Sequence, residues 1–259
     1  MKKYLLILFF ASQWATAQKV GGGCDGCELM YVGMPKTISS IDTSAGWAEK
    51  GQKLLITGTV YKIDGTTPAP DVIIYYWHTD AQGHYSPKGK MNEKAKRHGH
   101  IRGWVKTDKK GKYTIYTLRP APYPDEQLPA HVHISIKEPS IKDEYYIDEL
   151  VFDDDKLLIA SQKKYPPENR GGSGILRTLI SGSLQIAEHD IILGLHIPHY
   201  PVLSKADTPP GLPLVKIAPR LFLIMLLDQI KAHELAPYVN MAVIMVLFIL
   251  WEIIPIGLK

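Results

Sequence analysis

Short runs of β-branched and aromatic residues, separated by turn signals such as Asp64-Gly65, recur along the middle of the chain. Five such runs are found, at residues 54–61, 72–77, 103–107, 113–117 and 131–136. Strands at this spacing, without a strong helical period, are typical of β-sandwiches and barrels. The sequence therefore predicts an all-β domain, which we place at residues 50–201.

The regions around these strands are predicted from their composition. Residues 18–49 are punctuated by glycines and serines, so we expect an irregular arm that packs on the domain. Residues 141–170 are charged and are predicted to be loop-like. Residues 190–197 are apolar and are followed by Pro198, which favours a closing strand there.

The first 17 residues have the layout of a secretory signal peptide. Lys2 and Lys3 precede the apolar run Tyr4–Ala11, and Ala15-Thr16-Ala17 provides an A-x-A cleavage site. We therefore expect an exported protein, periplasmic or otherwise extracytoplasmic. Removal of the leader lowers the formal net charge from +4 to about +2. So balanced a charge gives no indication of a nucleic-acid partner.

The C-terminal end differs in composition from the domain. Residues 202–216 are predicted to be a linker and residues 217–259 a hydrophobic, helical tail. Residues 238–257 carry one charge, Glu252, and their length of about 20 residues matches a bilayer core of about 30 Å. We expect a membrane anchor at residues 238–257. Because Glu252 and Pro255 interrupt the segment, a helix packed on the domain or on a partner is the alternative.

The two cysteines, Cys24 and Cys27, form a C-x-x-C pair without a second pair elsewhere. Such a pair can be redox-active or form half of a zinc site. In an exported protein a small local disulfide is the favoured interpretation.

The strand at residues 131–136 has two histidines on one face. Val132, Ile134 and Ile136 point to one side because side chains alternate along a strand, while His131 and His133 point to the other. Residues i and i+2 lie roughly 6.5–7 Å apart at Cα, from where two imidazoles can reach one metal ion. A metal site is predicted here, and an exposed polar strand face is the alternative. If the metal were zinc, a third histidine would be needed, and the candidates are His98, His100, His196 and His199.

Four separated motifs extend this prediction. They are residues 77–86 (WHTDAQGHYS), Arg102-Gly103 with residues 107–113 (TDKKGKY), residues 120–124 (PAPYP) and residues 129–133 (PAHVH). Together they resemble the intradiol ring-cleavage dioxygenases. The resemblance implies a β-sandwich core and one mononuclear non-haem Fe(3+) ion, and it implies the iron ligands Tyr85, Tyr123, His131 and His133.

The resemblance also implies an activity, the cleavage of a catechol between its two hydroxylated carbons with insertion of both atoms of O2. Tyr123 would be displaced by the substrate and take up substrate protons. One departure is Leu128, which stands where the family commonly has an arginine. Arg102 or Arg119 could substitute, and we expect Arg102 to be a catalytic residue.

Two other functions fit the same residues. One is a non-catalytic, exported β-sandwich module on a membrane stalk, which would bind a metal or a phenolic ligand. The other is a zinc hydrolase that uses His131, His133 and a third histidine.

Overall fold

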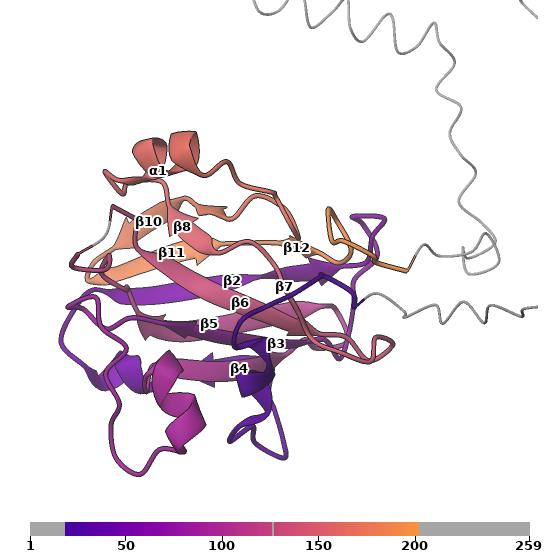
Figure 1. The fold of residues 1–259 in the computed structure, drawn as a ribbon, viewed down its shortest axis with the longest axis horizontal. Helices are drawn as coiled ribbons and strands as arrows, with labels where there is room; N and C mark the ends of the chain where they lie inside the picture. The colour runs from indigo at the N-terminus through magenta and orange to yellow at the C-terminus, as the bar shows by residue number, and fades with distance from the viewer. Residues whose placement is uncertain (1–18, 126, 202–259) are drawn as a thin grey trace, which may run out of the picture. The chain divides into compact units, whose positions relative to one another are not determined.

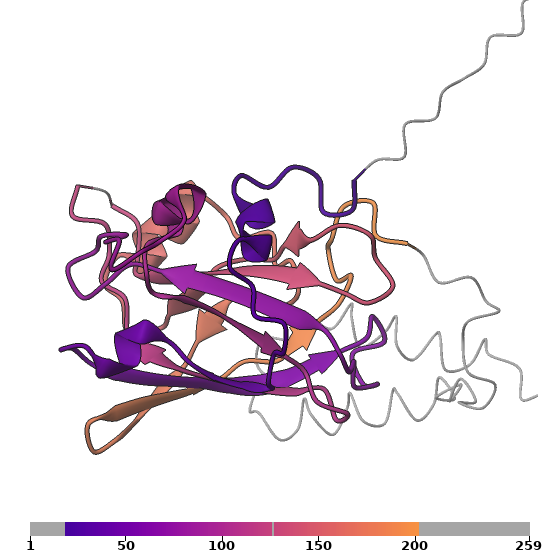
Figure 2. The ribbon, with the colours of Figure 1, turned by 90° about the horizontal axis from the view of Figure 1, so that it is seen from below.

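The computed structural model describes residues 19–125 and 127–201. These residues form two six-stranded sheets (Figure 1), which Figure 2 shows from below. The first sheet has the order β1-β5-β2-β11-β10, with β12 also paired to β2, and contains β1 (Ile41–Thr43), β2 (Lys53–Tyr61), β5 (Lys112–Leu118), β10 (Thr178–Ser181), β11 (Leu184–Glu188) and β12 (Ile191–Ile192). The second has the order β4-β3-β6-β8-β9, with β7 also paired to β6, and contains β3 (Ile73–His78), β4 (Arg102–Lys106), β6 (His131–Lys137), β7 (Tyr145–Tyr146), β8 (Leu150–Phe152) and β9 (Ile175–Leu176). The described helices are α1 (Leu158–Lys164) and three short 3₁₀ helices, Cys27–Tyr31, Ala45–Ala48 and Glu93–His98.

The main hydrophobic core lies between the two sheets. Leu54 and Ile56 of β2 are fully buried in it together with Ile134 and Ile136 of β6. The alternation along both strands sends these side chains inward, and each one contributes about 1.5–3 kcal/mol by leaving water. The predicted all-β core is therefore confirmed.

The strands are distributed between the sheets in a way that the turn signals do not indicate. β2 and β3 flank the Asp64-Gly65 turn but lie in different sheets, and so do β4 and β5. β2 instead pairs with β5 on one edge and, in parallel, with β11 and β12 on the other. The chain thus crosses repeatedly between the layers.

Three expected regions differ from the structure. Residues 18–49, expected to be an irregular arm, contain β1, which pairs with β5 in the first sheet. Residues 141–170, expected to be loop-like, contain β7, β8 and α1. The strand expected at residues 190–197 is limited to the two residues of β12, while β11 was not predicted. Short strands with charged neighbours are stabilised here by pairing with β6 and β2, which a local pattern cannot reveal.

The arm covers the outer face of the second sheet. Met30, from the 3₁₀ helix Cys27–Tyr31, packs on Tyr75 and Trp77 of β3 in a second buried cluster. The Trp104 indole N–H donates to the carbonyl of Met30 at 2.7 Å. The arm therefore covers the part of this outer face that β3 and β4 form.

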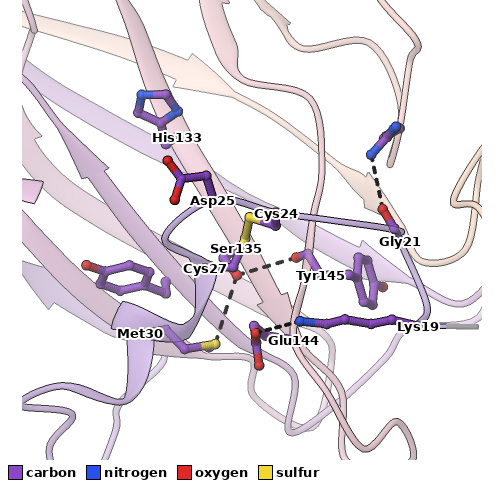
Figure 3. The surroundings of a disulfide bond; sticks show 12 residues. Lys19, Gly21, Cys24, Asp25, Cys27, Met30, His133, Ser135, Glu144 and Tyr145 are labelled. Atoms are coloured by element: carbon purple, nitrogen blue, oxygen red, sulfur yellow. Dashed lines mark hydrogen bonds and ion pairs between the residues drawn. A yellow bond between two sulfur atoms is a disulfide. The ribbon is translucent and has the colours of Figure 1, made fainter.

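Cys24 and Cys27 form a disulfide in this arm, as predicted. Figure 3 shows its surroundings, in which the Ser135 hydroxyl of β6 has two possible acceptors, Met30 Sδ at 3.9 Å and the carbonyl of Tyr145 at 3.4 Å. The bond closes the segment that leads into the 3₁₀ helix.

The predicted leader at residues 1–17 and the predicted tail at residues 202–259 lie outside the described residues. The chain divides into two units after Pro201. Within residues 19–125 and 127–201, no helix has the length and apolar character needed to cross a membrane.

Candidate metal centre

The histidine pair lies at the start of β6, on the face opposite the main core. Val132 and Ile134 point into the core, so His131 and His133 project from the other side, with ring centroids 4.7 Å apart. Trp77 lies opposite His133 in the register of β3 and β6, and the two rings stack at 4.8 Å. The predicted alternation of this strand is confirmed.

Tyr85 reaches the pair from the loop after β3. Asp80 shapes this loop, because its carboxylate accepts the backbone N–H groups of Gln82 and His84 at 2.9 and 3.0 Å and the Ser86 hydroxyl at 2.6 Å. Burial raises the pKa of Asp80, but these hydrogen bonds outweigh it and lower that pKa overall.

Tyr123 reaches the pair from the Pro-rich loop before β6, and the two tyrosine loops touch. The Thr79 hydroxyl donates to the carbonyl of Ala121 at 2.7 Å. Gly83 has a φ of +83°, and a Cβ at Gly83 would lie 2.1 Å from the Pro122 carbonyl oxygen. Only glycine allows the loops to approach this closely.

Four possible donor atoms meet at this point. Tyr85 Oη lies 2.7 Å from Tyr123 Oη and 2.8 Å from His133 Nε2. Tyr123 Oη lies 3.1 Å from His131 Nε2 and 3.4 Å from His133 Nε2. The structure therefore brings together all four of the predicted ligand residues.

Both imidazoles have a partner at Nδ1, the ring nitrogen that faces away from the phenols. His131 Nδ1 donates to the Pro129 carbonyl at 2.8 Å, and His133 Nδ1 lies 3.3 Å from Glu149 Oε1. Because Nδ1 carries the proton in this arrangement, the Nε2 lone pairs are directed at the phenols. Burial, assisted by the nearby His133, lowers the pKa of His131 and keeps the ring neutral. Neutral imidazole is the form that binds a metal.

The donor set fits a ferric ion. Atoms that lie about 2 Å from a common metal are themselves about 3 Å apart, and the four distances given above lie between 2.7 and 3.4 Å. Phenolates are hard, anionic oxygen donors that suit Fe(3+), and imidazole is compatible with iron. Two oxygen and two nitrogen donors from Tyr85, Tyr123, His131 and His133 would hold the ion.

Glu149 was not predicted. It lies just before β8, whose residue Val151 pairs with His131, so the register brings Glu149 next to His133. Burial raises the pKa of Glu149, but the hydrogen bond and charge of His133 outweigh it and bring that pKa to about 2. Glu149 faces Nδ1, on the far side of the ring from the phenols, so it is placed to orient His133.

The other expected participants lie elsewhere. Arg102, expected to be catalytic, donates to the carbonyls of Leu29 and Val32 and lies over the rings of Tyr75 and Trp104. The structure does not bring it to the donor cluster, because the arm occupies its guanidinium. Arg119 pairs with Asp154 at 2.5 Å and is likewise absent from the cavity lining.

The expected third histidine for zinc is not found among the described residues. His98 is bonded to Tyr75 at 2.8 Å and is separated from His133 by the stacked ring of Trp77. His100 is bonded to Glu49, and His196 and His199 do not line the cavity. Within the described residues the one group of His, Cys, Asp and Glu donors is His131, His133 and Glu149.

The donor cluster opens into a cavity of about 890 Å³. The arm contributes Gly23, Cys24 and Asp25 to one wall, and α1 with the segment that follows it contributes another. Leu128 also lines it. The arm was expected to be a packing segment, and the structure gives it a second role as part of this wall.

Comparison with known proteins gives one family. A family model described as Dioxygenase matches residues 35–164, half of the chain. Catechol 1,2-dioxygenase of Acinetobacter baylyi is 28% identical over 124 residues, which are 40% of this chain and 38% of the relative. Catechol 1,2-dioxygenase 1 of Acinetobacter lwoffii is 30% identical over 164 residues, 53% of this chain and 50% of the relative. The chain thus spans half or less of the length of these curated relatives.

A solved structure, a variant of the catechol 1,2-dioxygenase of Acinetobacter radioresistens, is 17% identical, with a TM-score of 0.49. The superposition covers 72% of this chain and 65% of that one. The assignment to a family rests on the family model and not on this likeness.

Proposed function

Because the chain belongs to the intradiol dioxygenase family, we propose that it is a ferric-iron dioxygenase that cleaves a catechol between its two hydroxylated carbons, inserting both atoms of O2. One observation carries the proposal, the meeting of two phenol oxygens and two imidazole nitrogens within 2.7–3.4 Å of their neighbours. The names of the two curated relatives support the same reaction.

Each residue of the proposed centre has its own role. A bound ferric ion would supply Lewis acidity, which favours the ionised forms of the phenols and of the substrate hydroxyls. His131 and His133 keep their Nε2 lone pairs directed at the centre, because Pro129 and Glu149 hold the opposite nitrogens. Tyr123 Oη, which neighbours Tyr85 and His131, takes up a proton from a catechol hydroxyl.

The test uses the colour that a tyrosinate gives to ferric iron. Iron-loaded protein should absorb in the visible range, and Tyr85→Phe or Tyr123→Phe should weaken or shift this band because each removes one phenolate. An oxygen electrode and the ultraviolet absorption of a muconate-type product then report turnover of catechol. A protein that stays colourless and free of iron after loading would exclude the proposal.

A second candidate, a binding module without turnover, is favoured by one observation. Leu128 lines the cavity, and neither Arg102 nor Arg119 does, so neither cation faces the bound ring. Such a module would bind catechol and consume no oxygen, and the same electrode measurement separates the two functions.

We also propose that the protein is exported and is anchored through residues 238–257. The layout of residues 1–17 and the composition of the tail support this, as does the Cys24–Cys27 disulfide, which fits an oxidising compartment. Fractionation of cells that express the chain with and without residues 202–259 tests the anchor. Equal recovery of both in the soluble fraction would exclude it.

A further inference from the structure

The charged residues of the cavity carry information about the substrate that the metal ligands do not. Two arginines, Arg97 and Arg170, line the cavity, and no lysine does so among the described residues. Four acids also line it, namely Asp25, Asp148, Glu149 and Glu168. The lining therefore has more negative than positive groups.

Each arginine is already paired with one of these acids. Arg97 Nη2 lies 2.7 Å from Asp25 Oδ2, and Arg170 Nε lies 2.5 Å from Glu168 Oε2. Arg170 also donates to the carbonyl of Gly21 at 3.3 Å. Two pairs of opposite sign cancel, so neither guanidinium offers an unmatched charge to a ligand.

The remaining two acids, Asp148 and Glu149, are neighbours in the chain, and neither forms a salt bridge with a lysine or arginine among the described residues. Arg170, which is paired with Glu168, is also close enough to Asp148 for their charges to interact, so two arginines stand against four carboxylates in this lining. Glu149 contacts His133, and its side chain keeps 41% of its surface exposed. Asp148 accepts the backbone N–H of Asn169 at 2.6 Å, which orders the carboxylate without neutralising it. Leu128, at the entrance to the histidine strand, adds no charge to the lining.

The volume of the cavity leaves room for a substituent to reach these groups. About 890 Å³ lies within the range of about 300–1,000 Å³ that holds drug-sized ligands, and a single catechol ring fills only a part of it. A substituent on the ring therefore extends into a lining with excess negative charge.

We infer that, given the proposed function, the substrate is a catechol whose ring substituent is uncharged or cationic and not a carboxylate. A carboxylate would be brought near Asp148 and Glu149 in a lining whose four carboxylates already outnumber its two guanidiniums, and its water of hydration would be lost. An ammonium group would instead find two carboxylates.

The experiment compares three catechols that differ at the end of one side chain. They are 4-ethylcatechol, 4-(2-aminoethyl)catechol and 3-(3,4-dihydroxyphenyl)propanoate. Calorimetric titration of the iron-loaded protein should give a dissociation constant for the propanoate at least about tenfold weaker than for the other two. This difference in dissociation constant between the propanoate and the other two catechols, the affinity gap, should narrow in high salt, because salt screens charge.

Two variants test the source of the gap. Asp148→Asn should narrow it by removing one excess charge while keeping an acceptor for Asn169. Asp25→Asn should also narrow it, by exposing Arg97 to the ligand. Glu188→Gln, an exposed position on β11 outside the cavity, is the matched control and should leave the gap unchanged.

Equal binding of the propanoate and 4-ethylcatechol would overturn the inference, and so would a gap that neither Asp variant narrows. Oxygen uptake is measured in parallel with the same compounds and with catechol itself. Binding in the expected order without any oxygen uptake would remove the enzymatic proposal and keep the charge selection. Turnover of these catechols with no dependence of binding on the charge of the side chain would support the enzymatic proposal and remove the charge selection.

Discussion

Glu149 is placed to fix the orientation of His133, which we propose as a metal ligand. Its carboxylate lies 3.3 Å from His133 Nδ1, on the opposite side of the ring from the two phenols. Such partners of a ligating histidine typically contribute 10–100-fold to metal affinity. At the scale of single residues, the contact between Glu149 and His133 is therefore part of the proposed metal site, together with the four ligand residues.

We predict that Glu149→Ala lowers iron affinity by about ten- to a hundredfold, because His133 loses the acceptor that fixes its tautomer. Glu149→Gln should lower iron affinity less than Glu149→Ala does, because the amide oxygen still accepts a hydrogen bond from His133 Nδ1. Competition with a chelator of known affinity measures both. Unchanged affinity in Glu149→Ala would show that His133 needs no such support.

Buried histidines determine how the fold responds to acid. His78 is bonded through both ring nitrogens, to the Thr79 carbonyl and to the Thr117 hydroxyl. Burial lowers the pKa of His78 to about 4, and burial also lowers the pKa of His189 to about 4. Both rings are therefore neutral in the folded protein.

We predict that the free energy of unfolding falls on acidification by about 1 kcal/mol per buried histidine between about pH 7.5 and 5.5. The folded pKa lies below the unfolded value near 6.5, so the stability is complete above that value and is lost as the pH falls toward 4. Chemical denaturation at both pH values measures it. His189→Gln should reduce the pH dependence, whereas His84→Gln, an exposed control, should preserve it.

At the scale of elements, the two tyrosine loops depend on one close contact. Gly83 has a positive φ, and a Cβ there would overlap the Pro122 carbonyl. Any side chain at this position would push apart the loops that hold Tyr85 and Tyr123.

We predict that Gly83→Ala strongly weakens iron binding and the visible band while most of the fold is preserved. Gly89→Ala is the matched control, because Gly89 also has a positive φ but has no atom within 4 Å of the added Cβ. Both variants carry the same backbone cost of about 1–2 kcal/mol. If the two lose iron to the same extent, the contact between the loops is not what holds the tyrosines together.

The sequence predicted the elements of the site better than their surroundings. Alternation along residues 131–136 was sufficient to predict the His131–His133 pair, because one face of that strand is buried. Tyr85 and Tyr123 follow from no local pattern, and only the family resemblance indicated them. Glu149 was missed because its position depends on the register between β6 and β8, and the charged segment between these strands was expected to be a loop.

Arg102 shows a further limit of sequence reasoning. Its charge made it a reasonable substitute for the cation missing at Leu128, but its guanidinium is occupied by two carbonyls of the arm and by the rings of Tyr75 and Trp104. The arm was expected to pack on the domain, but nothing in its composition indicated that it would bind Arg102. Local propensity also predicted most of the long strands, and it could not predict which sheet each one joins.

At the scale of the whole described domain, the central strand of the first sheet, β2, depends on strands from the C-terminal end of the described residues. β2 pairs with β5 on one edge, while β11 and β12 cover the other edge. The family match ends at residue 164, before either of those last strands begins. A chain shortened to the matched region would leave a long β-branched strand with exposed amide and carbonyl groups, which invites intermolecular pairing. Soluble production of this domain therefore has to extend through Ile192, although the recognisable chemistry stops well before it.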